Sequence, residues 1–343
     1  SGNMNKDRMI DRIGDYLIPH TNDYIFDELS ESCLERAGLA DILTGVPVPI
    51  RKTELTGLTN VKIAHNMAVI IGCNINFQYR DSYLEYIRHS FGKDFAKPLI
   101  NEGIESAAQG DFDYACICFR GALLIDPESK DALYCYGRAC RDSYDAGEGE
   151  EYVGRYKAEA LEAFEKLTLS APDFDMGFYY LGYLYLNLGL YLKAKLTWEE
   201  FMKLAASDNG DSTKQREEIS EWLRKLDEPV KIEAAYNKVL SGRFEQGIEE
   251  LSPYAKDSRF DEWWPLWYYL GVAYSHTGDK VRAEESFRRV LEISPSNTEA
   301  MEELVSLYEA AGDEERREKY AEKIKLVKKN REEEKAERNK GLS

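Results

Sequence analysis

Six cysteines and four histidines are the residues of this 343-residue chain whose types could hold a metal or attack a substrate. Cys116 and Cys118 lie two positions apart in a predicted helix, so their side chains face different sides and cannot share one ion. Cys135 and Cys140 follow in the same region. We interpret all six cysteines as reduced thiols in a helical core, and the sequence therefore predicts no metal site.

The histidines and carboxylates also lack the spacing that catalysis requires. The histidines are scattered along the chain, at His20, His65, His89 and His276. The sequence contains no glycine-rich phosphate loop, nucleophile elbow or HExxH pattern. Acidic pairs at helical spacing are common, and such pairs are more often a solvated helix face than an acid–base dyad. We therefore expect no catalytic residue and no cofactor.

The charge of the chain argues against two kinds of partner. The formal net charge at pH 7 is −18, whereas nucleic acid and anionic membranes are bound through clustered lysine and arginine. No apolar run approaches the roughly 20 residues of a membrane span, and nothing after Met4 resembles a signal peptide. Together with reduced cysteines, these features favour a cytoplasmic protein. The residues before Met4, Ser1-Gly2-Asn3, resemble an expression remnant.

Helices must position whatever this chain binds, and the first 95 residues predict a mostly helical N-terminal section. Apolar residues at helical spacing predict helices around 10–17, 26–37 and 83–91. The Pro- and Gly-punctuated stretch 43–50 is expected to be extended. Residues 61–71 fit either a helix or a buried strand, and we favour the helix.

The most informative stretch is 267–295, which predicts two short helices folded against each other. Trp267, Leu270 and Tyr274 are spaced three and four residues apart and share one helix face. Gly278 is expected to end the first helix in the left-handed conformation, and Asp279 to cap the second. Pro295 stops the second helix. One such hairpin cannot bury its apolar stripe alone, so copies must stack.

This stretch resembles the tetratricopeptide repeat family. The residues that carry the resemblance are Trp267, Leu270, Gly271, Tyr274, Ala283, Phe287 and Pro295. A first copy begins near residue 96, further copies run through Gly137 and Gly182, a weaker one begins near residue 228 and another runs through Met301, so the resemblance covers about 96–331. It implies an all-α, right-handed solenoid of helix–turn–helix repeats. We divide the chain into an N-terminal section (1–95), a first array with a capping helix (96–227, with a turn-rich break at 207–212), and a second array that fades into a charged helix (228–343).

The resemblance also implies where a partner would bind. In this family the first helices of the pairs line a concave groove, which here would be rich in tyrosine with two arginines towards one end. The fourth copy also places Ile232 and Val239 in this groove. The residues that we predict to contact a peptide or partner are Tyr134, Arg138, Arg141, Tyr179, Tyr183, Tyr236, Tyr268 and His276. Any single tyrosine among them could instead pack between adjacent helices.

The sequence thus predicts a non-enzymatic protein–protein interaction module, with the partner and the oligomeric state left open. The Lys/Asn/Arg clamp with which some family members grip a C-terminal carboxylate is absent. The corresponding positions hold Ile100, Ile104, Cys135, Met176 and Tyr180. One alternative is a peptide-sensing signalling regulator whose output is the N-terminal section. Another is an enzyme with a site in residues 4–95.

Overall fold

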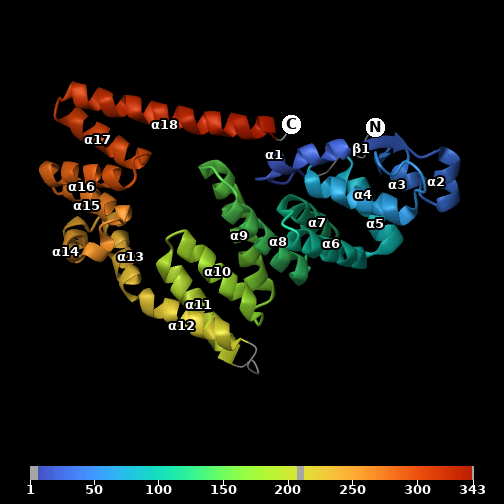
Figure 1. Ribbon diagram of the computed structural model, residues 1–343, viewed down its shortest axis with the longest axis horizontal. Helices are drawn as coiled ribbons and strands as arrows, with labels where there is room; N and C mark the ends of the chain where they lie inside the picture. Colours follow the sequence, from blue (N-terminus) through green and yellow to red (C-terminus); the bar gives the residue numbers. More distant parts are fainter. Residues whose placement is uncertain (1–6, 207–211, 342–343) are drawn as a thin grey trace. The chain divides into compact units, whose positions relative to one another are not determined.

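The structure is a computed structural model that describes residues 7–206 and 212–341 (Figure 1). The described residues are almost entirely helical and form successive antiparallel helix pairs, as expected for an all-α solenoid. Residues 1–3 and most of the predicted break at 207–212 lie outside the described part.

The chain divides into two compact units, which are described separately. Unit 1 comprises 1–184 with the last residues, 337–343, and unit 2 comprises 185–336. The boundary falls within helix α10 (Asp175–Asn187). These units reflect where contacts concentrate, and the division of the chain at residues 95 and 227 stays a prediction.

Unit 1 begins with the N-terminal section, which mixes short helices with a two-stranded antiparallel sheet. Its elements are α1 (Gly14–Leu17), η1 (Ile18–Asp23), β1 (Tyr24–Glu28), α2 (Glu31–Ala37), α3 (Ala40–Leu43), β2 (Pro47–Arg51), α4 (Asn60–Cys73), α5 (Arg80–Phe91) and η2 (Lys93–Phe95). The helices predicted at 61–71 and 83–91 are confirmed as α4 and α5, and the extended stretch at 43–50 ends in β2.

The other two helices predicted in this section are confirmed only in the second half of their predicted ranges. Ile10 is 83% exposed, and α1 begins only at Gly14. In the second case, residues 24–28 form β1, and the helix starts after Ser30, whose side chain accepts a hydrogen bond from the Cys33 amide. β1 pairs with β2 in a register that places Phe26 opposite Pro49. This partner lies far along the chain, so local periodicity could not reveal it.

The sheet rests on α4 and α5 through hydrogen bonds from buried polar side chains. The Tyr83 hydroxyl donates to the Pro47 carbonyl at 2.6 Å, and the Asn66 amide donates to the Pro49 carbonyl at 3.2 Å. α4 in turn crosses α7 at glycines: a Cβ on Gly72 would lie 2.2 Å from the Ile117 carbonyl oxygen. The N-terminal section is therefore packed against the first repeat.

The repeats of unit 1 follow the predicted order. They are built from α6 (Ala96–Ala108), α7 (Phe112–Ile125), α8 (Lys130–Ala146), α9 (Glu150–Ser170) and α10. The acidic run around 142–151 lengthens α8 and α9.

One local contact defines the repeat in both units. A small residue of the first helix meets a phenylalanine of the second, so closely that a Cβ would lie about 2.5–2.7 Å from the ring. The pairs are Gly103 with Phe119, Gly137 with Phe164, and Gly271 with Phe287. The repeated glycine and phenylalanine therefore set the distance between paired helices.

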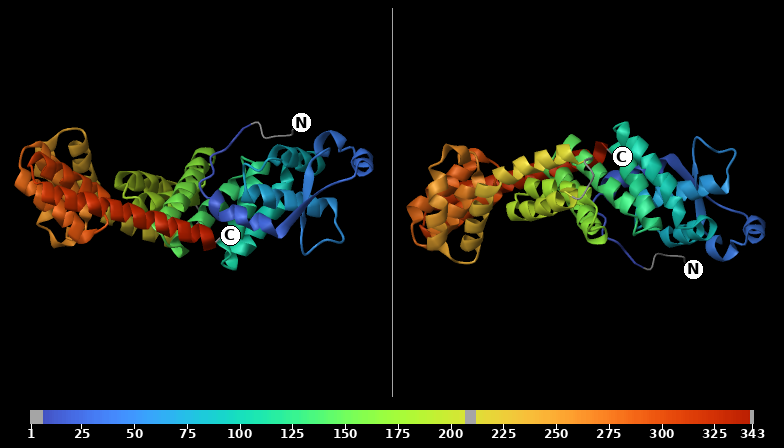
Figure 2. Two further views of the ribbon diagram at one scale, coloured as in Figure 1. Left: turned by 90° about the horizontal axis from the view of Figure 1, so that it is seen from above. Right: turned by 90° about the horizontal axis from the view of Figure 1, so that it is seen from below.

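Unit 2 contains the remaining repeats (Figure 2). Its helices are α11 (Tyr191–Ala206), α12 (Thr213–Lys225), α13 (Asp227–Leu240), α14 (Phe244–Ala255), η3 (Ser258–Phe260), α15 (Trp264–His276), α16 (Lys280–Ile293), α17 (Thr298–Ala310) and α18 (Glu314–Gly341). The predicted caps between α15 and α16 are confirmed: Gly278 has φ +84°, and the Asp279 side chain accepts from the Arg282 amide at 3.2 Å. The long charged terminal helix is α18.

Candidate partner-binding surfaces

In unit 1, aromatic rings of α8 and α10 form a continuous cluster, here called the α8–α10 cluster. It consists of Tyr134, Phe174, Tyr179, Tyr180 and Tyr183, all half-buried. Tyr134 contacts Phe174 at 5.1 Å and Tyr180 at 5.8 Å between ring centroids. Tyr179 contacts Tyr180 at 5.0 Å and Tyr183 at 5.2 Å. The structure thus brings together three of the predicted tyrosines, and adds Phe174 and Tyr180.

Two arginines of α8 lie over these rings. The Arg138 guanidinium is 5.2 Å from the Tyr134 ring centroid and 5.3 Å from that of Tyr180, and Arg141 is also 5.3 Å from Tyr180. Arg141 has a distant carboxylate, Asp145, at 3.9 Å, whereas Arg138 has no ion pair within the described residues. The rings hold the guanidinium of Arg138 in place by cation–π contact while leaving its donors available to an acceptor.

Burial shapes the chemistry of this cluster. It raises the pKa of Tyr134 to about 12, so its hydroxyl is neutral at physiological pH and can act as donor or acceptor. Tyr180 stacks on the buried ring of Phe164 at 5.7 Å, which fixes the base of the cluster on the repeat core. Tyr180 also lies at a position where some family members carry a residue of the carboxylate clamp. This position was the only feature of the sequence that pointed to Tyr180 as a binding residue.

In unit 2, a second group of rings surrounds Tyr268 on α15. Tyr268 is half-buried and contacts Tyr269 at 5.4 Å, Trp264 at 6.3 Å and Phe287 at 5.8 Å. Burial raises its pKa to about 12. We call Trp264, Tyr268 and Tyr269 the α15 cluster. Of these, only Tyr268 was predicted.

The fourth copy departs from the predicted groove. Ile232, Tyr236 and Val239 are 0%, 7% and 2% exposed and belong to the core of unit 2. Together with Ala235 they occupy the face of α13 that packs inward. The positions that the family pattern assigns to the groove therefore lie on the core side of this helix. The Tyr236 ring stacks on Tyr269 at 4.5 Å and so supports the α15 cluster from within.

His276 is exposed at the end of α15 and stacks on Phe244 at 4.3 Å. Its Nδ1 lies 2.9 Å from the Val272 carbonyl oxygen of its own helix. One ring nitrogen of His276 is therefore occupied by its own helix. The stacking on Phe244 places the His276 ring at the start of α14 and not among the tyrosines of the α15 cluster.

The N-terminal segment of unit 1 is held on second helices of the repeats. Asp11 makes a two-pronged ion pair with Arg120 of α7, with oxygen–nitrogen distances of 3.0 and 2.9 Å. Arg12 contacts both Glu159 and Glu162 of α9 at 2.7 Å. These ion pairs lie on α7 and α9, whereas the α8–α10 cluster belongs to α8 and α10.

One polar cluster at the junction of α4, α6 and α7 was not predicted. Glu102 lies 2.5 Å from His65 Nε2 and accepts from the Tyr114 hydroxyl at 2.5 Å. Burial acts to raise the pKa of Glu102, but these two hydrogen bonds outweigh it and lower the pKa. The neighbouring Cys118 thiol is buried, which raises its pKa and keeps it protonated. The cluster joins the N-terminal section to the first repeat.

The cysteines, the possible metal ligands and the apolar character of the helices can also be examined in the described residues. All six cysteines are free, and four of them are buried: Cys73, Cys116, Cys118 and Cys140. Within 7–206 and 212–341, no group of three or more His, Cys, Asp or Glu side chains is placed to hold a metal ion. In the same residues, no helix combines the length and the apolar character needed to cross a bilayer.

Comparison with known proteins identifies one repeat directly. Residues 264–297 match the family model described as tetratricopeptide repeat. This match covers α15, α16 and the turn after them, where the Gly271–Phe287 contact and both caps are present. No curated protein matches the sequence.

Solved structures of repeat proteins are similar at low identity. The P58(IPK) TPR domain is 21% identical, with coverage of 67% of this chain and 60% of that chain and a TM-score of 0.44. A tetratricopeptide repeat protein from Parabacteroides merdae is 15% identical, covering 79% and 93%, with a TM-score of 0.35. Pseudomonas aeruginosa PilF is 16% identical, covering 72% and 99%, with a TM-score of 0.31. Residues 264–297 are therefore the part of the chain that is matched to the family.

Proposed function

We propose that this chain, which belongs to the tetratricopeptide repeat family, is a non-enzymatic interaction module that holds a peptide or helix of a partner protein on its tyrosine clusters. The family supports a protein partner. The α8–α10 cluster supports the finer proposal, because half-buried tyrosines beside a guanidinium with unused donors are the residue types that dominate protein interfaces.

The contact chemistry follows from the geometry. Tyrosine rings offer broad apolar area with little loss of side-chain entropy on binding, and their hydroxyls can pair with a partner backbone. Arg138 can donate two parallel hydrogen bonds to a carboxylate of the partner. An interface of this kind reaches affinities near micromolar, or about −8 kcal/mol.

The experiment first identifies the partner by affinity capture from native lysate and then measures its affinity by calorimetry. Tyr179→Ala and Tyr268→Ala should each weaken binding by roughly 1–2 kcal/mol, because each removes a ring from a cluster. Leu169→Ala is the matched control, since Leu169 is 84% exposed on α9 and belongs to neither cluster. Unchanged affinity in both tyrosine variants, with the fold intact, would place the contact elsewhere.

A second candidate function is a regulator in which a bound peptide changes the N-terminal section. Its specific support is the set of ion pairs that holds Asp11 and Arg12 on α7 and α9, the second helices of two repeats. Under this proposal, adding the captured partner changes hydrogen exchange in residues 7–23. Unchanged exchange at saturating partner would exclude it. No observation favours an enzyme.

A further inference from the structure

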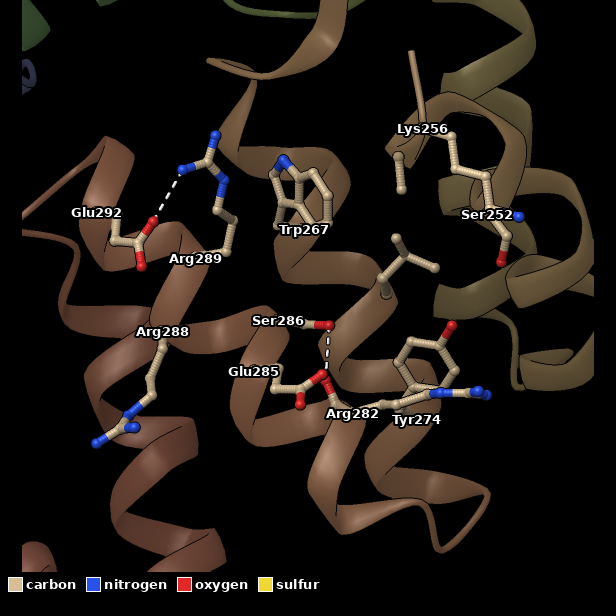
Figure 3. A pocket seen from close by; sticks show the side chains of 12 residues that line it. Ser252, Lys256, Trp267, Tyr274, Arg282, Glu285, Ser286, Arg288, Arg289 and Glu292 are labelled. Carbon is tan, nitrogen blue, oxygen red and sulfur yellow. Dashed lines mark hydrogen bonds and ion pairs between the residues drawn. The ribbon is translucent and has the colours of Figure 1, made fainter. Parts of the chain in front are cut away.

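Unit 2 has a cavity of about 540 Å³ between α14, α15 and α16 that the proposed function does not use (Figure 3). One side is formed by Ser252, Ala255 and Lys256 at the end of α14. Its floor is Trp267, Leu270 and Tyr274 of α15, and its other side is α16 from Arg282 to Glu292. The volume lies within the range of about 300–1,000 Å³ typical of ligand sites.

The charges that line this cavity are predominantly positive, although the chain as a whole is strongly acidic. The charged residues lining it are Lys256, Arg282, Arg288, Arg289, Glu285 and Glu292. Arg289 is engaged by Glu292 at 2.8 Å and by the Asp261 carbonyl at 3.0 Å. Lys256 is exposed and has no ion pair within the described part of the chain. Arg288 has a loose ion pair with Glu284 at 3.7 Å, so Lys256 is the lining cation that has no carboxylate partner among the described residues.

The cations are held in place by the aromatic floor. Arg289 lies 5.7 Å from the Trp267 ring centroid, and Arg282 lies 5.8 Å from that of Tyr274. Arg282 has only a loose ion pair, with Asp279 at 3.6 Å, and its side chain is 66% exposed. The Trp267 indole N–H is buried without a hydrogen-bond acceptor in the described residues. The rings thus orient two arginines of the cavity before any ligand arrives.

The shape of the cavity favours an extended ligand. Its wall follows α16 from Arg282 to Glu292, a rise that corresponds to about 15 Å along a helix. An extended peptide covers that distance with about four or five residues. The half-buried rings of Trp267 and Tyr274 belong to the floor, so the floor can also accept an apolar side chain (Figure 3).

We propose that the cavity between α14 and α16 is a second binding surface, which takes an acidic peptide segment. A carboxylate of that segment pairs with Lys256 and Arg282, and an adjacent apolar side chain rests against the rings of Trp267 and Tyr274. The surface is built mainly from second helices of the repeats, so it is distinct from the α8–α10 and α15 clusters. Acidic-motif recognition by arginine and lysine rests on charge-assisted hydrogen bonds, and it weakens as salt is added.

The test measures fluorescence anisotropy of a fluorescein-labelled peptide, Glu-Asp-Leu-Glu-Glu, titrated with the full chain. Saturable binding is expected at low salt, and the double variant Lys256→Glu/Arg282→Glu should weaken it about tenfold or more. Lys328→Glu is the matched control, because this exposed lysine of α18 lies outside the cavity. Circular dichroism checks that each variant keeps its helix content.

Three outcomes would overturn the proposal. The labelled peptide could show no saturable binding at protein concentrations up to millimolar. Lys328→Glu could weaken binding as much as the double variant does, or a peptide with lysine in place of the acidic residues could bind equally well. Competition by inorganic phosphate as effective as by unlabelled peptide would assign the cavity to a free anion instead. Tyr179→Ala should leave this binding unchanged, so failure here and failure of the proposed partner site are separable.

Discussion

At the scale of single residues, the ion pair between Asp11 and Arg120 is a buried polar link between the N-terminal segment and the repeats. The two side chains are only 11% and 4% exposed, so both charges are removed from water. Such a pair adds little compared with a well-packed apolar pair, but breaking it leaves a buried charge without compensation. The energetic consequence therefore depends on which partner is removed.

We predict that Asp11→Ala lowers the free energy of unfolding by about 3–5 kcal/mol, because Arg120 would remain buried and unpaired. Chemical denaturation measures the change. Asp27→Ala is the control, since Asp27 is exposed on β1, and it should stay within about 0.5 kcal/mol of the parent. The double variant Asp11→Ala/Arg120→Met should recover much of the loss. An Asp11→Ala variant as stable as the control would show that the pair contributes nothing.

At the scale of helices and strands, the sequence predicts those elements that are determined by residues close together in the chain. The repeat helices could be predicted because the glycine and phenylalanine of the Gly271–Phe287 pair recur in other copies and caps such as Asp279 act locally. β1 could not, because Phe26 has its strand partner at Pro49. The burial of Tyr236 was missed for a similar reason: which face of α13 is inside is decided by the helices around it.

Helix crossing provides a prediction at the same scale. Gly72→Ala should destabilise the chain by about 1–3 kcal/mol or more, because the new Cβ would lie 2.2 Å from the Ile117 carbonyl oxygen where α4 crosses α7. Gly154→Ala, inside α9, should instead stabilise by about 0.5–1 kcal/mol, since nothing lies within 4 Å of its Cβ position. Thermal unfolding followed by circular dichroism compares the two. Equal effects would mean that close approach of α4 and α7 is not what the glycine provides.

At the scale of the whole molecule, most contacts of each unit lie within that unit. Unit 1 is centred on a core that includes Phe164, and unit 2 contains two cores, one of which includes Phe287. In repeat proteins stability is approximately a sum of local terms and nearest-neighbour terms, so damage to one core need not reach a distant one. The two units are therefore expected to lose structure in separate steps.

Truncation of one core phenylalanine in each unit tests this expectation. Phe164→Ala and Phe287→Ala each remove a ring that is at most 1% exposed, and each should cost about 3–5 kcal/mol in its own unit. Hydrogen exchange with mass spectrometry should then show lost protection in residues 96–184 for the first variant and in 228–336 for the second. Each variant serves as the control for the other. Loss of protection in both regions for either variant would mean that the chain unfolds as one cooperative body, because damage in one unit would then be transmitted to the other.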